Sequence, residues 1–136
     1  MARRMNRAAS TMPSDPEAVV RAAEAAYQSL DIDRMTALFD PRVVMKWNGV
    51  TVAEGLEAVR QNHLDGIFGT LPDGRPKVRD YTIRKWLRAA TGNVIGVEWE
   101  EDWIDVATGE RYHGFGAEFW WLDADRLVEW HAYQAE

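Results

Sequence analysis

The sequence predicts an α+β fold in which a curved antiparallel β-sheet wraps around N-terminal helices. Two observations carry this prediction. Apolar residues recur at helical spacing in the first half of the chain, whereas in the second half apolar and polar residues alternate along long segments joined by short turns. Strands joined by short turns form an antiparallel meander, and the helices before it must cover one of its faces.

The first helix is expected to begin at residues 14–17. Ser14 and Glu17 match a capping box, and Pro16 occupies a position where a missing N–H costs nothing. An apolar stripe follows, formed by Val20, Ala23, Tyr27 and Leu30. Residues 1–13 contain three arginines and are expected to be a disordered basic tail ahead of a single domain of residues 14–136.

A short second helix is expected to end before Pro41, and a short strand at residues 43–48 ends at Gly49. The third helix, about residues 55–67, has an inward stripe that includes His63. A histidine on an apolar stripe is either a hydrogen-bonded core residue or a group for acid/base chemistry or ligand binding, and both alternatives remain open.

Strands are predicted at residues 78–89, in a hairpin over 94–122, and at 127–134. In the hairpin, Glu101 shares its face with apolar residues and Trp99, and Glu118 shares its face with Trp120. Burying an unpaired carboxylate costs several kcal/mol. These two glutamates therefore indicate either the solvent-filled entrance of a pocket or a catalytic site.

A hairpin closed at residues 108–109 would place Glu101 opposite Gly116 and within about 7–8 Å of Glu118. Carboxylates this close couple, so one is expected to be protonated beside an ionised neighbour. The alternative is that both glutamates accept hydrogen bonds from Trp and Tyr, or pair with Lys85 or Lys46. Gly114 and Gly116 are expected to leave space for a ligand on the inward face.

Composition excludes several classes of function. The 136-residue chain has a formal net charge of −6, which disfavours a nucleic-acid partner, and it has no cysteine for a thiolate metal site or nucleophile. No apolar run approaches the ~20 residues of a membrane helix. A phosphate-binding glycine loop and a G-x-S-x-G turn are also missing. We therefore expect a cytoplasmic protein with no membrane association, no organic cofactor and no metal.

Three motifs resemble a known superfamily: A-L-F-D-P-R-V-V-x-x-W at 37–47, E-G-x-x-A-V at 54–59 and W-x-x-Y at 130–133. With the order of elements, they resemble the nuclear-transport-factor-2-like superfamily and, within it, the SnoaL-like polyketide-cyclase branch. The resemblance implies a cone-shaped, cystatin-like fold with one deep pocket between sheet and helices. It also implies dimerisation through the outer face of the sheet.

The resemblance to two enzyme families of this superfamily is incomplete. Ketosteroid isomerases place a base where this chain has Trp47 and a tyrosine where it has Ala23, but their donor acid falls at Glu118. Epoxide hydrolases of this fold keep an acid at Glu101, but their Arg and second acid are missing here. The resemblance therefore disfavours both reactions and keeps an acid at each of the two inward positions.

The predicted protein is a small-molecule enzyme for proton transfer, of the isomerase, dehydratase, cyclase or hydrolase type, acting on a flat apolar, aromatic or polyketide-like substrate. Glu101 would be the base, Glu118 the protonated acid and His63 a supporting donor. The predicted pocket residues are Trp47, Asn48, Trp99, Trp103, Tyr112, Trp120 and Trp130. The alternative is a non-catalytic ligand-binding or dimerisation module. An outer aromatic stripe of Phe115, Phe119 and Trp121 predicts a homodimer.

Overall fold

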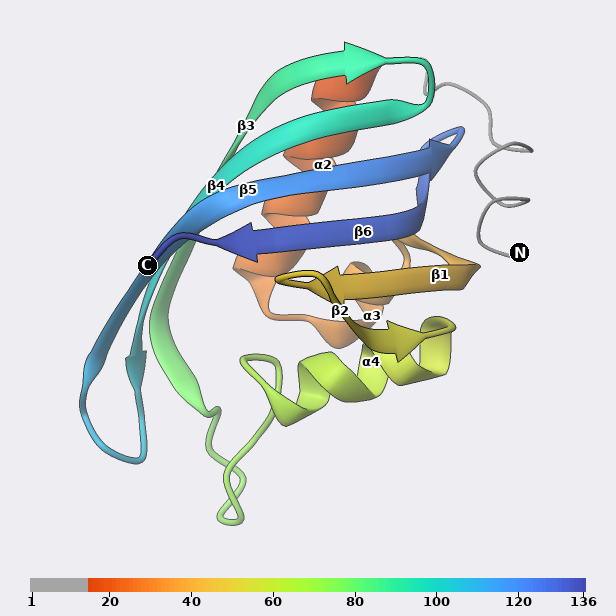
Figure 1. Cartoon of the computed structure of the whole chain (residues 1–136). Coiled ribbons are helices and arrows are strands. Elements are labelled where there is room, and N and C mark those ends of the chain that lie inside the picture. Colours follow the sequence, from red (N-terminus) through yellow and green to blue (C-terminus); the bar gives the residue numbers. More distant parts are fainter. Residues whose placement is uncertain (1–14) are drawn as a thin grey trace.

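The structure is a computed structural model that describes residues 15–136. Its elements, in chain order, are α2 (Pro16–Ser29), α3 (Ile32–Thr36), β1 (Phe39–Trp47), β2 (Val50–Glu54), α4 (Leu56–Asp65), β3 (Val78–Thr91), β4 (Val94–Asp105), β5 (Arg111–Asp123) and β6 (Arg126–Gln134). The strands form a single sheet in the order β2-β1-β6-β5-β4-β3 (Figure 1). The predicted tail of residues 1–13 lies outside the described residues.

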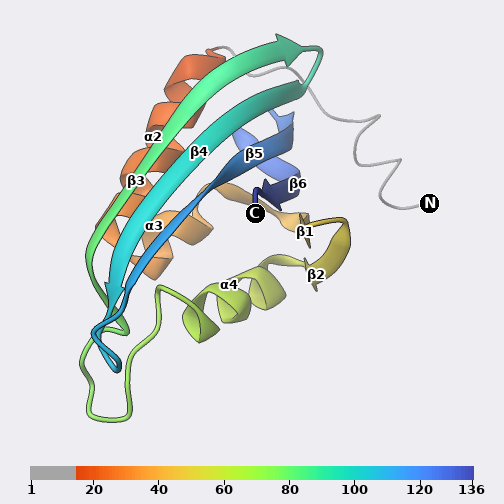
Figure 2. The same ribbon diagram turned by 60° about the vertical axis from the view of Figure 1, so that its left-hand side comes forward.

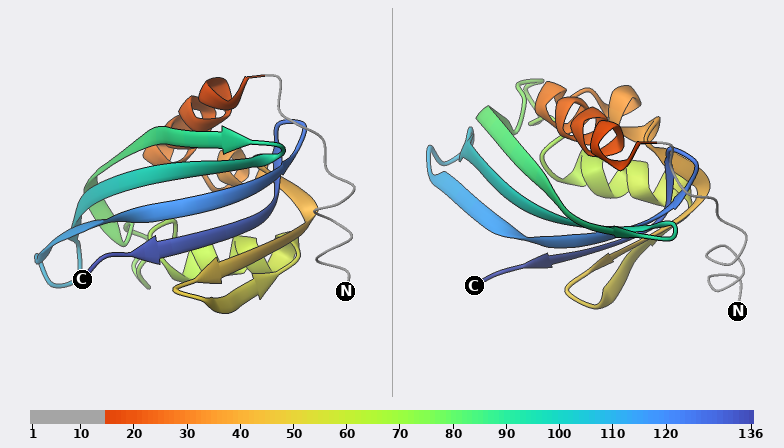
Figure 3. Two further views of the ribbon diagram at one scale, coloured as in Figure 1. Left: turned by 45° about the horizontal axis from the view of Figure 1, so that its top comes forward. Right: turned by 90° about the horizontal axis from the view of Figure 1, so that it is seen from above.

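The sheet is curved, and the helices fill its concave side. Figure 2 shows β3, β4 and β5 bending along α2, and Figure 3 shows α2, α3 and α4 on the same side of the sheet. Buried side chains of α2, among them Val20, Ala23 and Tyr27, join the sheet's inner residues in one hydrophobic core. This arrangement confirms the predicted α+β fold. No helix within residues 15–136 is long and apolar enough to cross a membrane.

Two features of the sheet were not predicted. β1 pairs with β6 in parallel, whereas all other neighbouring strands are antiparallel. β2 is an additional edge strand that returns from β1 through Asn48 and Gly49, whose φ angles of 48° and 84° suit a two-residue hairpin turn. The sequence pattern of β2 is uninformative because four of its five residues are exposed.

The start of α2 differs in its capping residue. Asp15 is the N-cap, and its side chain accepts a hydrogen bond from the backbone N–H of Ala18 at 3.2 Å. The expected capping residue, Ser14, lies outside the described part of the chain. Pro16 occupies the first turn, as predicted, because that position requires no backbone donor.

The register of the β4–β5 hairpin differs from the prediction by two residues. Glu101 lies opposite Gly114, and Glu118 lies opposite Val97. The connection is longer than assumed, since Asp105 N–H still donates to the carbonyl of Glu110 at 2.8 Å before the chain turns. The predicted diagonal contact between the two glutamates is therefore wrong, although both still face the concave side.

Side chains of α2 cover the free edge of β3. The amide of Gln28 donates to the carbonyl of Tyr81 and accepts the backbone N–H of Ile83, and Glu24 accepts the backbone N–H of Lys85 at 2.8 Å. An uncovered edge strand offers unpaired groups to other chains, and here a helix supplies their partners. These bonds also fix the position of β3, and with it Lys85, relative to α2.

Candidate functional site

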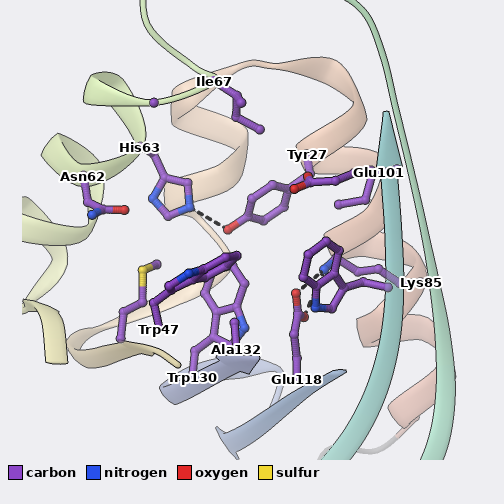
Figure 4. Close-up of a pocket in the computed structure, with 14 residues that line it drawn as sticks. Tyr27, Trp47, Asn62, His63, Ile67, Lys85, Glu101, Glu118, Trp130 and Ala132 are labelled. Carbon is purple, nitrogen blue, oxygen red and sulfur yellow. Dashed lines mark hydrogen bonds and ion pairs between the residues drawn. The ribbon is translucent and has the colours of Figure 1, made fainter. Parts of the chain in front are cut away.

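A cavity lies between α2, α4 and the concave face of the sheet (Figure 4). Its volume is about 170 Å³, and a cavity of about 150 Å³ is known to hold benzene. It is partly open to solvent, and one of its lining residues, Trp47, is 38% exposed. The residues that line it are Tyr27, Met45, Trp47, Asn62, His63, Gly66, Ile67, Ile83, Lys85, Trp99, Glu101, Glu118, Trp130 and Ala132.

An ion pair between Lys85 and Glu118 forms one wall. Nζ of Lys85 lies 2.9 Å and 3.0 Å from the two carboxylate oxygens, and the indole N–H of Trp120 donates to the same carboxylate at 2.8 Å. All three contacts are donated to Glu118, so its carboxylate acts here as an acceptor and not as the protonated donor that we expected. The pairing with Lys85 was the alternative left open by the sequence.

Aromatic rings surround the Lys85 ammonium. Nζ lies 5.4 Å from the ring centre of Tyr27, 5.5 Å from that of Trp120 and 5.8 Å from that of Trp130. Aromatic faces attract a cation through their quadrupole, and the attraction grows when the cation is removed from water. These rings add to Glu118 in stabilising a charge that would otherwise be costly to bury.

Glu101 projects from β4 and is the carboxyl group whose ionisation the cavity opposes. Burial raises the pKa of Glu101, and this effect exceeds the opposing effects of a hydrogen bond from Tyr81 and of the Lys85 charge. The hydroxyl of Tyr81 donates to Oε2 of Glu101 at 2.9 Å. A partly desolvated carboxylate with one oxygen held in place is suited to general acid/base chemistry.

His63 is engaged with protein groups through both ring nitrogens. Nδ1 lies 2.8 Å from the carbonyl of Val59, which can only accept, so Nδ1 carries the proton. Nε2 lies 2.8 Å from the hydroxyl of Tyr27 and accepts its hydrogen bond. Burial lowers the pKa of His63 to about 4, so the ring is neutral at pH 7. Burial and the Glu118 charge raise the pKa of Tyr27, which keeps its proton.

The three candidate catalytic residues, His63, Glu101 and Glu118, all line the cavity, but they do not form hydrogen bonds with one another. In Figure 4, His63 and Tyr27 meet on the helical side, whereas Glu101, Lys85 and Glu118 project from the strands opposite. These residues do not form a metal-ligating group. Among the described residues only Glu100, Asp102 and His113 bring three potential ligand atoms within 4.8 Å of one another.

Three of the seven predicted pocket residues line the cavity: Trp47, Trp99 and Trp130. The other four do not. Asn48 is in the β1–β2 turn, where its side chain accepts a hydrogen bond from the backbone N–H of Gln134. The rings of Trp103 and Tyr112 stack on each other, with centroids 4.0 Å apart, farther along the hairpin. Trp120 donates its indole N–H to Glu118 of the ion pair. Alternation identified the inward face of each strand, but not how far along it the helices leave space.

Gly114 and Gly116 do not create space for a ligand, contrary to expectation. A Cβ at Gly116 would lie 1.8 Å from the carbonyl oxygen of Tyr133, and one at Gly114 would lie 3.0 Å from the ring of Tyr112. The glycines therefore allow the close approach of a neighbouring backbone and of an aromatic ring.

The sequence prediction did not place Tyr81, Lys85 or Asn62 among the site residues, and it named Lys85 only as an alternative partner for the two glutamates. A signal was present for Lys85, because it alternates onto the same face as the apolar Ile83 and Leu87 of β3. Tyr81 shares this face too. Asn62 precedes His63 on α4, and nothing in the local sequence indicates that its side chain reaches the cavity (Figure 4).

Comparisons with known proteins agree on the fold. An NTF2-like protein of unknown function from Exiguobacterium sp. 255-15 has a TM-score of 0.68 and 17% identity, and the match covers 87% of this chain and 98% of that one. A ketosteroid isomerase-like protein from Erwinia carotovora atroseptica has a TM-score of 0.64 and 16% identity, covering 88% and 93%. An LEH-like epoxide hydrolase from M. tuberculosis has a TM-score of 0.62 and 16% identity, covering 87% and 80%.

At these identities the structural similarity shows the fold alone. A comparison with curated protein sequences finds no match. The sequence model of the SnoaL-like domain, however, matches residues 19–130, which is most of the chain. The protein therefore belongs to the SnoaL-like domain family, and it has the fold of nuclear-transport-factor-2-like proteins.

Proposed function

We propose that the cavity binds a small ring-shaped molecule and that Glu101 transfers a proton on it without an organic cofactor. The observation that carries the proposal is the position of Glu101: a carboxyl group with a pKa raised by burial, in the wall of a cavity that is also lined by three tryptophans and a tyrosine. A raised pKa makes a carboxylate a stronger base, and titratable groups perturbed in this way are typical of functional sites.

The step that this geometry favours is proton abstraction next to a carbonyl group. Glu101 takes the proton from the carbon, and the electron pair of the broken C–H bond moves onto the carbonyl oxygen, giving an enolate. An ammonium has three N–H bonds, so the two contacts of Lys85 with Glu118 leave a third for this oxygen. In a substrate whose C=C bond is conjugated with this enolate, return of the proton from Glu101 to the far carbon of that bond shifts the double bond and completes an isomerisation.

Lys85 thus takes the role of donor that we first gave to Glu118. Glu118 holds the ammonium in place, and Tyr81 orients the base by binding one of its oxygens. A volume of about 170 Å³ accommodates one or two small rings. The isomerase and hydrolase names of structurally similar proteins are compatible with chemistry at this cavity.

Exchange of carbon-bound protons for deuterium tests the proposal. The probe is 2-indanone, a bicyclic ketone with acidic protons beside its carbonyl, incubated with the protein in D₂O and followed by ¹H NMR. We expect exchange well above the protein-free rate, and a loss of about 100-fold or more in Glu101→Gln. The matched control is Glu100→Gln, because Glu100 is the exposed neighbour on the opposite face of β4. Wild-type exchange at the protein-free rate, or equal rates in both variants, would contradict the proposal.

The second candidate function is binding of a small molecule without turnover. It is favoured by the saturation of two expected catalytic groups, since His63 and Glu118 are both fully engaged with protein partners. Isothermal titration calorimetry separates the candidates. A binder takes up 2-indanone with measurable heat but does not raise the exchange of its protons above the protein-free rate.

A further inference from the structure

The cavity is partly open to solvent, and the lining residues that are not buried border its opening. They are Trp47 of β1, Asn62 of α4, Gly66 at the end of α4, Ile67 and Glu101, whereas all other lining residues are buried. The first three are exposed and the last two are half-buried, so the entrance lies between β1 and the C-terminal half of α4. Asn62 is therefore placed where a ligand in the cavity meets solvent.

The side-chain amide of Asn62 is free to bind a ligand. In the part of the chain that the structure describes, it forms no hydrogen bond, whereas the preceding Gln61 donates to the carboxylate of Asp65 at 2.9 Å. The residues one helical turn before and after Asn62 are Ala58 and Gly66, which have no polar side chain that could bind it. Figure 4 shows the Asn62 side chain extending from α4 toward the cavity.

Most other polar side chains of the cavity already bind protein groups. His63 is bonded through both ring nitrogens, Lys85 and Glu118 are paired, and one oxygen of Glu101 accepts a tyrosine hydroxyl. Two accessible side chains thus keep a carboxyl or amide group for a ligand, namely Glu101 and Asn62. Figure 4 shows them on opposite sides of the cavity, Glu101 among the strands and Asn62 on the helix.

The chemistry of the amide indicates what it binds. A carboxamide is neutral and both donates and accepts hydrogen bonds, and a hydroxyl is the smallest neutral group that does the same. A charged substituent would gain no counter-charge from Asn62, and the cation of the cavity, Lys85, is already paired with Glu118. In a pocket with mainly apolar walls, a few polar contacts fix the orientation of the ligand.

We infer that Asn62 is a ligand-binding residue whose amide holds a hydroxyl group on the ring edge remote from the reacting carbonyl. The ligand is then a neutral, hydroxylated cyclic ketone. This inference rests on the function proposed above and narrows its substrate class. Asn62 orients the ring, and proton transfer stays with Glu101.

Three ketones of one skeleton test the inference by isothermal titration calorimetry: 2-indanone, 5-hydroxy-2-indanone and 5-methyl-2-indanone, whose methyl group matches the hydroxyl in size. We expect the preference for the hydroxy over the methyl ketone to be about 5- to 10-fold greater in the wild type than in Asn62→Leu. The parent 2-indanone should bind both proteins alike, which shows that the cavity of the variant is intact.

Gln61→Leu is the matched control, because Gln61 is the exposed neighbour on α4 that binds Asp65, and it should keep the wild-type preference. The same preference in the wild type and in Asn62→Leu, with or without an equal loss for all three ketones, would overturn the inference.

Deuterium exchange reports the orientation of the ring. The two methylene groups beside the carbonyl of 5-hydroxy-2-indanone are distinct, and a ring held at its hydroxyl presents one of them to Glu101. We expect the ratio of their exchange rates, divided by the protein-free ratio, to differ from one by about 5-fold in the wild type and to approach one in Asn62→Leu. An unchanged ratio in Asn62→Leu would show that the apolar walls orient the ring, and would overturn the role of Asn62.

The outcomes separate this inference from the proposed enzyme. If the hydroxyl preference depends on Asn62 but no ketone exchanges above the protein-free rate, the ligand class stands and catalysis fails. If exchange depends on Glu101 but the hydroxyl preference does not depend on Asn62, catalysis stands and the role of Asn62 fails. If none of the three ketones binds, both are overturned.

Discussion

The ammonium of Lys85 lies within 3.0 Å of both carboxylate oxygens of Glu118, and the two side chains are 1% and 4% exposed. A buried pair of this kind contributes little net stability when intact, because both charges lose their hydration. Breaking it is costly, since the remaining charge stays buried without a partner. The stability of this wall of the cavity therefore depends on a single ion pair between β3 and β5.

We expect Lys85→Met to lower the free energy of unfolding by about 3–5 kcal/mol, because Glu118 is left uncompensated. The double variant Lys85→Met/Glu118→Leu should recover part of this loss. Urea unfolding measures both. Arg88→Met is the control: it breaks the exposed pair between Arg88 of β3 and Glu98 of β4 and should cost at most about 1 kcal/mol. Equal effects of the two single substitutions would contradict the structure.

His63 should make stability depend on pH. Its pKa is about 4 in the folded protein and ordinarily 6.5, so between these values the unfolded chain binds a proton that the folded protein does not. Stability is therefore lost as the pH falls from about 6.5 to about 4, with a total effect of about 3 kcal/mol. His63→Gln should lack this part of the dependence, and the exposed His113→Gln should retain it. Identical pH profiles of wild type and His63→Gln, measured by urea unfolding, would rule out the buried neutral histidine.

The hydrogen bond from Tyr81 should lower the pKa of Glu101, the proposed base. Its hydrogen bond to Glu101 opposes the effect of burial, so Tyr81→Phe is expected to raise the pKa of Glu101 further. The measurement is ¹³C NMR titration of the Glu101 carboxyl group, assigned with Glu101→Gln, and it requires no substrate. Tyr133→Phe is the control, because Tyr133 is exposed on the outer face. A pKa that is unchanged or lower in Tyr81→Phe would show that the hydrogen bond does not stabilise the carboxylate.

Helical spacing and strand alternation in the sequence were sufficient to predict the α+β class and the direction of the side chains in β4 and β5. Glu101 and Glu118 face inward because each is an even number of residues from buried neighbours such as Val97 and Trp120. The register between them was not predictable, because it depends on where the chain turns between Asp105 and Glu110. A two-residue difference preserves the face but changes every partner across the hairpin.

Contacts between elements distant in sequence were beyond the reach of local patterns. The bond between Tyr27 and His63 joins α2 to α4, and the pair of Lys85 and Glu118 requires β3, β4 and β5 to be in register. The sequence could limit Glu118 to a few partners, including Lys85, but only the packed sheet selects one. The same holds for the cavity, whose extent is set by the placement of the helices.

The homodimer stays a prediction, and the outer face of the sheet is where it should form. Phe115, Phe119 and Tyr133 are between 41% and 48% exposed there. We propose that a second copy covers these rings, so that light scattering after size-exclusion chromatography should give twice the monomer mass and Phe119→Asp should give the monomer. Val52→Asp, at an exposed apolar position on the edge strand β2, should leave the mass unchanged. A monomeric wild type would end the proposal.

Gly116 should be required for the packing of β5 against β6. A Cβ there would lie 1.8 Å from the carbonyl oxygen of Tyr133 and 2.9 Å from its carbonyl carbon, and these backbone atoms cannot move unless the strands separate. We therefore expect Gly116→Ala to lower the free energy of unfolding by about 1–3 kcal/mol or more. Gly114→Ala should cost less, because its Cβ would meet the ring of Tyr112, which can rotate away. Urea unfolding and 2-indanone calorimetry on both variants test this reasoning, since a glycine that only made room for ligand would, when replaced, weaken binding and leave stability unchanged.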